Sequence, residues 1–179
     1  MEKIKSIIKD NRALCIVLLL GFVMTVAYAF YFKVNVTVDA QAYDSIAWSL
    51  VQGTGYTEIR PGATPDQAIG RLGPGYEFFL AGIYAVFGHR VWVVWVIQAF
   101  LHVGSAFFVY LLTKRLLKGA EWPAVLTAGV YIFFIDLLEF PAMLLTETLY
   151  LFLVLAALNF AFNYVEHERT GDVAGAAAL

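Results

Sequence analysis

Apolar residues occur along the chain in long runs, and the lengths of these runs predict membrane-spanning helices. A helix needs about 20 predominantly apolar residues to cross the hydrocarbon layer of a bilayer. Four runs reach or approach this length: residues 13–32, 91–113, 122–138 and 144–165, of which the third is marginal. The pattern therefore predicts an all-α, multi-pass membrane protein with about four transmembrane helices.

Residues 33–90, between the first two spans, are predicted to form an extracytoplasmic loop that contains two shorter helices. In residues 38–51 an apolar face of Tyr43, Ile46, Ala47 and Leu50 lies opposite a polar face of Gln41, Ser45 and Ser49. This arrangement is typical of an amphipathic helix that lies in the membrane interface. Residues 76–88 are apolar but too short to span, which predicts a second interfacial or re-entrant helix. The segment between them is rich in proline and glycine and predicts an ordered loop.

The first apolar run admits two interpretations. A basic segment precedes it, and Ala27-Tyr28-Ala29 resembles a signal-peptidase site. However, apolar residues continue past Ala29 to Phe32, whereas the apolar core of a signal peptide runs for about 7–15 residues. A retained membrane anchor is therefore favoured over a cleaved signal peptide, and both interpretations export the residues that follow.

The distribution of positive charge predicts the orientation, because cytoplasmic loops are enriched in lysine and arginine. With the N-terminus in the cytoplasm, the inside carries eight such residues: Lys3, Lys5, Lys9, Arg12, Lys114, Arg115, Lys118 and Arg169. The outside then carries four: Lys33, Arg60, Arg71 and Arg90. This orientation places the carboxylates of interest on the extracytoplasmic face, and the expected location is a cell membrane, the inner membrane of a bacterium.

Composition agrees with a membrane protein and narrows the chemistry. The chain is 61% hydrophobic and 15% charged, whereas soluble domains carry about 25% charged residues. A net charge of −2 gives no reason to expect nucleic acid as a partner. The three histidines have no ligand-like spacing and Cys15 is the single cysteine, so no metal or other cofactor is expected. A divalent cation near the carboxylates is possible, but no pattern supports it.

Three stretches of the chain together resemble a known family. These are "DAQAYDSIAWSLVQGTGYT" from Asp39, "RLGPGYEFFLAGIYAVFG" from Arg71 and "LLTETLYLFLVLAAL" around Glu147. In order and spacing they are similar to the N-terminal module of the GT-C glycosyltransferases, such as the protein O-mannosyltransferases and the lipid A aminoarabinose transferase. The resemblance implies a sugar donor linked to polyprenyl phosphate, and an acceptor that is a protein, a lipid or a glycan.

The chain departs from that family in four respects. Ala40 stands where many relatives have an acidic residue, and Glu77 follows Tyr76 where relatives often have proline. Relatives also often have paired prolines in this turn. The family's enzymes contain more membrane helices, so the chain is expected to be a fragment of a longer enzyme. A bacterial relative with an unassigned acceptor fits these departures better than a typical protein O-mannosyltransferase does.

Two candidate site residues lie on the first interfacial helix. The family resemblance implies that Asp39 is the base that removes the acceptor's proton, a task that a carboxylate performs within hydrogen-bond reach. The alternative is a helix N-cap. Tyr43 lies one turn further on the same face, where it would hydrogen-bond the donor or position the base. Its alternative is an aromatic anchor in the interface.

Two further candidates come from the other matching stretches. Arg71 is expected to hold the donor phosphate bidentately as negative charge develops on it, and the alternative is a lipid-headgroup contact. Glu147 is expected to bind substrate or shape the site, and the alternative is a first-turn acid beside a Thr146 cap. Other acids are weaker candidates (Asp136 and Glu139) or are expected to be solvated (Asp44, Glu58, Asp66 and Glu77).

The sequence thus predicts a membrane glycosyltransferase that uses a polyprenyl-phosphate sugar on the extracytoplasmic face. Two other classes of protein remain open. A non-catalytic membrane subunit that assembles with another chain would be distinguished by an absence of transfer activity. A small transporter or lipid flippase is disfavoured, because polar residues would then lie in paired, broken helices at membrane depth, whereas the acids here gather at one interface.

Overall fold

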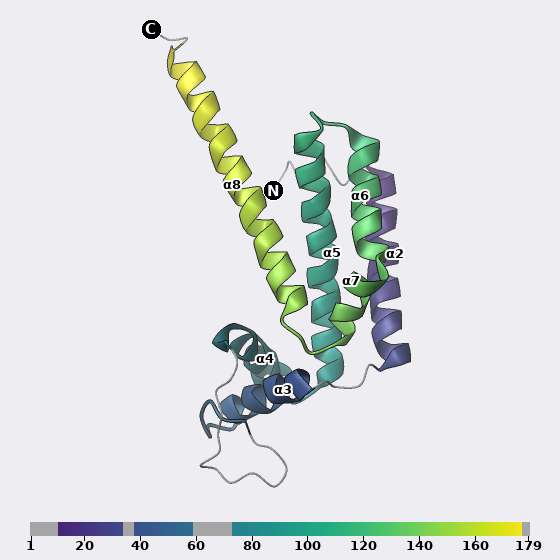
Figure 1. The fold of residues 1–179 in the computed structure, drawn as a ribbon, viewed down its shortest axis with the longest axis vertical. Coiled ribbons are helices and arrows are strands. Elements are labelled where there is room, and N and C mark those ends of the chain that lie inside the picture. The colour runs from purple at the N-terminus through teal and green to yellow at the C-terminus, as the bar shows by residue number, and fades with distance from the viewer. Residues whose placement is uncertain (1–10, 34–37, 59–72, 177–179) are drawn as a thin grey trace.

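The computed structural model describes residues 11–33, 38–58 and 73–176, and the regular elements of these residues are helices. Helices α2 (Arg12–Phe32), α5 (Val91–Leu116) and α6 (Glu121–Phe133) lie side by side (Figure 1). Helix α8 (Glu147–Ala176) packs against α5 and leans away from the bundle toward its C-terminus (Figure 1). The shorter helices α3 (Val38–Val51) and α4 (Pro74–Phe87) lie together across one end (Figure 1). The predicted all-α, multi-pass architecture is confirmed.

Three of the described helices are long and apolar enough to cross a membrane: Arg12–Phe32, Val91–Leu116 and Glu147–Glu166. The third predicted span, 122–138, is not one straight helix. Helix α6 ends at Phe133, and the following segment, α7 (Ile135–Glu139) with the 3₁₀ turn η2 (Phe140–Ala142), is bent from it by 59°. The number of spans in the described part of the chain is therefore three, or four if this bent pair crosses as one.

The bend between α6 and α7 occurs where Phe134 adopts an extended backbone, with φ −68° and ψ 123°. The first carboxylates after the apolar run, those of Asp136 and Glu139, come after this residue. Both residues consequently lie on α7, which runs in a different direction from α6, and α6 ends before either of them. An acid at membrane depth is costly, so the change of direction keeps these two side chains out of the continuation of α6.

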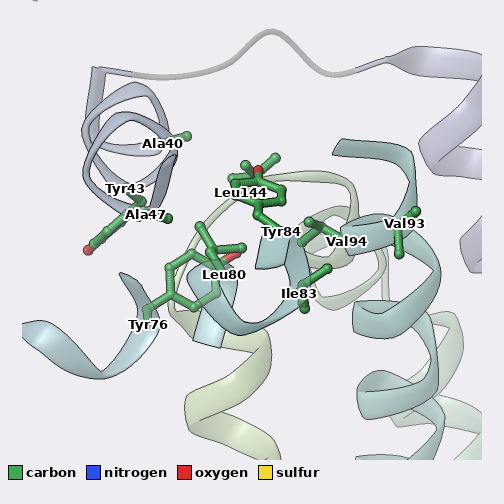
Figure 2. Packing of buried hydrophobic residues seen from close by; sticks show 10 residues of the cluster. All are labelled: Ala40, Tyr43, Ala47, Tyr76, Leu80, Ile83, Tyr84, Val93, Val94 and Leu144. Carbon is green, nitrogen blue, oxygen red and sulfur yellow. The ribbon is translucent and has the colours of Figure 1, made fainter. Parts of the chain in front are cut away.

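Helix α3 has the residue range and the buried face that its periodicity predicts. Ala40, Tyr43 and Ala47 face α4, and they belong to one cluster with residues of α4, α5 and the segment before α8 (Figure 2). The other members of this cluster are Tyr76, Leu80, Ile83, Tyr84, Val93, Val94 and Leu144. Ser49, which was expected on the polar face, is buried. The cluster fixes α3 and α4 to the end of the bundle.

A polar cluster joins α2, α5 and α6 at the opposite end of the bundle. Asn11 caps α2 by accepting a hydrogen bond from the Leu14 amide at 3.1 Å, and its side-chain amide donates to Glu121. Tyr110 also donates to Glu121, at 2.7 Å, and Lys114 forms an ion pair with the same carboxylate. The Glu121 carboxylate accepts from all three side chains, so these contacts link the start of α2 to the end of α5 and the start of α6.

The close approach of α2 and α6 depends on Gly21. A Cβ atom at this position would lie 2.1 Å from Cδ1 and 2.6 Å from Cγ1 of Ile132, a residue that is fully buried. We therefore expect Gly21→Ala to destabilise the protein by about 1–3 kcal/mol, as overpacking in cores does. The measurement is the thermal unfolding midpoint in detergent.

Gly82 on α4 provides the matched control for that substitution. A Cβ atom there meets nothing within 4 Å, so Gly82→Ala should be neutral or should stabilise the helix by about 0.5–1 kcal/mol. Equal shifts of the midpoint for the two variants would contradict the importance of the contact between α2 and α6.

Candidate functional site

Asp39 is exposed and lies in the first turn of α3, which begins at Val38. The helix thus starts before Asp39, which does not agree with the alternative that this residue is the N-cap. Anionic side chains are stabilised near a helix N-terminus by the helix dipole and by the free backbone N–H groups. The structure therefore presents an accessible carboxylate near the N-terminus of α3.

Tyr43 is the candidate residue on which the charges of Asp39 and Glu147 both act. It is buried at the edge of the cluster, and its ring packs edge-on against that of Tyr76, with centroids 5.1 Å apart. The pKa of Tyr43 is raised above its usual value, first by burial and then by the negative charges of Glu77, Asp39 and Glu147. A hydrogen bond with the side chain of Thr146 opposes the shift. Negative charges on α3, α4 and α8 therefore all act on the Tyr43 hydroxyl.

Glu147 is half-buried and is the first residue of α8. The Thr146 hydroxyl donates a hydrogen bond to the Glu147 carboxylate at 3.3 Å. This position agrees with the alternative of a first-turn acid stabilised by the helix dipole. It also places the carboxylate within electrostatic range of Tyr43, so both interpretations of Glu147 can hold together.

A buried glutamine aligns the elements that carry these residues. Gln98 on α5 is fully buried, and its carbonyl oxygen accepts a hydrogen bond from the Tyr76 hydroxyl at 2.8 Å. Its amide nitrogen donates to the backbone carbonyls of Pro141 at 3.0 Å and Met143 at 2.7 Å. One side chain thus links α4 to the segment that leads into Glu147. The sequence does not reveal this role, because a lone polar side chain in a span does not indicate its partners.

The prediction that Glu77 is solvated is wrong, because its side chain is fully buried. The Tyr56 hydroxyl donates a hydrogen bond to Oε1 of Glu77 at 2.8 Å. This bond and burial raise the pKa of Tyr56 to about 12, with burial as the larger cause. A signal for this burial was present in the sequence, since Glu77 shares the helical spacing of the buried residues Leu80 and Tyr84.

Glu58 was also expected to be solvated and is not, whereas Asp44, with the same expectation, is partly exposed and has side-chain partners. Glu58 is buried. Asp44 accepts a hydrogen bond from Tyr84 at 2.5 Å and pairs with Nε2 of His89 at 2.9 Å. The His89 ring stacks on Trp48 with centroids 4.8 Å apart. This group connects α3 to the junction between α4 and α5, and it holds α3 in position.

Arg71, the predicted partner of the donor phosphate, lies outside the described residues, as do Arg60 and Asp66. The role of Arg71 therefore remains a prediction. The weaker candidates of α7 are described: Asp136 is exposed and Glu139 is half-buried.

The described side chains suit the transfer of a group between hydroxyl-bearing molecules. An exposed carboxylate, such as that of Asp39, is able to accept a proton from a nucleophile. Nearby carboxylates and the Tyr43 hydroxyl provide hydrogen-bond acceptors and a donor for a polar substrate. The elements that carry these groups, α3, α4 and the start of α8, lie at the same end of the bundle (Figure 1).

Comparison with known proteins finds one family. The family model described as dolichyl-phosphate-mannose-protein mannosyltransferase matches residues 71–179, which is more than half of the chain. The matched region includes Glu77 and Glu147, whereas Asp39 and Tyr43 precede it. No curated protein and no solved structure gives a significant match.

Proposed function

Because the chain belongs to the dolichyl-phosphate-mannose-protein mannosyltransferase family, we propose that it transfers a sugar from a polyprenyl-phosphate donor to a hydroxyl or amine acceptor at the membrane surface. The observation that carries this proposal is that the negative charges of Asp39 and Glu147 both act on Tyr43, which is buried where α3 packs against α4. Glu147 is far in the sequence from Asp39 and Tyr43, and these two residues precede the region that the family model matches. Their convergence supports a single site.

In the proposed reaction Asp39 is the general base. Its carboxylate takes the proton of the acceptor as the acceptor oxygen or nitrogen bonds to the anomeric carbon. The bond between that carbon and the phosphate oxygen breaks, and polyprenyl phosphate leaves as an anion. The exposed position of Asp39 in the first turn of α3 leaves it accessible to an acceptor that approaches from the aqueous side.

We assign the leaving phosphate to Arg71 on chemical grounds. A guanidinium binds two phosphate oxygens at once and compensates charge that increases as the bond breaks. In the same proposal Tyr43 and Glu147 bind polar groups of the substrate, because the charges of Asp39 and Glu147 both act on the Tyr43 hydroxyl.

The proposed active face is the extracytoplasmic one. The end of the bundle remote from α3 and α4 carries Lys114, Arg115 and Lys118, a concentration of positive charge that is typical of cytoplasmic ends. The site end then faces away from the cytoplasm, and lipid-linked donors suit this side because their head groups lie in the interface.

A transfer assay tests the proposed function. The full-length native protein would be reconstituted in liposomes with polyprenyl-phosphate mannose carrying a labelled sugar, and the release of polyprenyl phosphate would be measured. We expect release with this lipid donor and none with a nucleotide-linked mannose. Failure of the lipid donor to bind or to react would overturn the proposal and would favour a non-catalytic membrane subunit.

A further inference from the structure

Glu77 is a buried carboxylate whose hydrogen bonding is incomplete. Its side chain is fully buried, and one oxygen, Oε1, accepts a hydrogen bond from Tyr56. The other oxygen, Oε2, has no hydrogen-bond partner among the residues that the structure describes. A buried carboxylate with an unfilled acceptor is costly, and such groups persist where a further donor completes them.

The position of Glu77 identifies where that donor would come from. Of the three carboxylates that act on Tyr43, Glu77 has the largest effect, ahead of Asp39 and Glu147. The next residue back along α4, Tyr76, packs edge-on against the Tyr43 ring. Glu77 therefore acts on the same tyrosine as Asp39, and it does so from α4, next to the residue that packs against that tyrosine.

The chemistry of the proposed donor lipid restricts which of its parts fits Glu77. The phosphate is an anion, and a carboxylate repels it. The polyprenyl chain offers no hydrogen-bond donor. The sugar alone carries O–H groups, or an N–H₃⁺ group in an amino sugar, that are able to donate to Oε2.

We propose that Glu77 determines sugar specificity, with Oε2 accepting a hydrogen bond from a hydroxyl or ammonium substituent of the donor's sugar ring. This inference rests on the proposed function and adds to it a contact that the family pattern does not predict, since relatives often have proline after the tyrosine. Tyr56 orients the carboxylate through Oε1 and leaves Oε2 for the sugar.

The experiment compares two lipids and one conservative variant. Glu77→Gln keeps the size of the side chain and an oxygen for Tyr56, and it replaces the free acceptor by an N–H donor. Binding of polyprenyl-phosphate mannose and of polyprenyl phosphate would be measured with the full-length protein in nanodiscs, without acceptor. We expect the variant to bind the mannose lipid about 10-fold more weakly or worse, and the bare phosphate within about twofold of wild type.

Tyr56→Phe is the matched control, because it removes the hydrogen bond to Oε1 and leaves Oε2 in place. If Glu77 only held Tyr56, the two variants would behave alike. We expect Tyr56→Phe to retain most of the preference for the sugar-bearing lipid. A third lipid that carries an amino sugar identifies the donor group: a larger loss than with mannose indicates an ammonium, and an equal loss indicates a hydroxyl.

Two outcomes would overturn the assignment of Glu77. One is that Glu77→Gln weakens the binding of both lipids equally, and the other is that it weakens the binding of neither. These results are distinct from a failure of the proposed function itself, in which the wild-type protein binds neither polyprenyl-phosphate lipid and both proposals are wrong.

Discussion

In the full-length protein, Asp39→Asn should abolish sugar transfer while leaving the fold and donor binding intact. The amide has nearly the size of the carboxylate but does not accept a proton at neutral pH, and general-base catalysis contributes about 10²–10⁴-fold to rate. Asp39 is exposed on the first turn of α3, outside the buried cluster, so its replacement removes no packing. The predicted loss is therefore in kcat and not in stability.

This prediction is measured as the rate of polyprenyl-phosphate release from the mannose lipid, together with the unfolding midpoint and the affinity for the lipid. Asp136→Asn on α7 is a suitable control, because it makes the same chemical change at another exposed aspartate. We expect the control to keep wild-type activity. Residual activity of Asp39→Asn close to that of wild type would contradict the role of Asp39 as the base.

Hydrophobic spacing predicted a helix well where one face of that helix is buried along its whole length. The face of α3 that carries Tyr43 and Ala47 is buried as the pattern indicates, since a period of 3.6 residues leaves little choice about which side packs. The bend after α6 was not predicted. Residues 130–135 are uniformly apolar, so neither hydropathy nor a local proline marks Phe134 as the point where the helix stops.

The relative placement of two candidate residues was predictable where both lie on the same helix. Asp39 and Tyr43 are four residues apart, and this spacing alone places them on one face of a helix. The burial of Glu77 was missed because composition favours a solvated acid beside a polar loop, whereas the helical phase of Leu80 and Tyr84 indicates the opposite. The partners of Gln98 lie on other elements, and local pattern does not reveal such contacts.

The second large effect is expected at Gln98. Gln98→Leu preserves volume approximately but removes three hydrogen bonds, and it leaves the Tyr76 hydroxyl and the carbonyls of Pro141 and Met143 without their partner. An unsatisfied buried group costs about 1–3 kcal/mol in water-soluble proteins, and polar contacts between membrane helices average about 0.6 kcal/mol. We expect a total destabilisation of about 2–4 kcal/mol, measured by unfolding in detergent, whereas Gln52→Leu at an exposed position should change stability by less than about 0.5 kcal/mol.

A second substitution separates the loss of hydrogen bonds from a simple packing defect. Removing the orphaned hydroxyl with Tyr76→Phe should recover part of the stability lost in Gln98→Leu, because replacing both partners of a hydrogen bond costs less than replacing one. The same double variant should remain impaired in transfer, since the backbone carbonyls of Pro141 and Met143, before Glu147, still lack their hydrogen bonds to α5. If Tyr76→Phe instead lowers the stability of Gln98→Leu further, Tyr76 and Gln98 contribute independently and the network does not act as one unit.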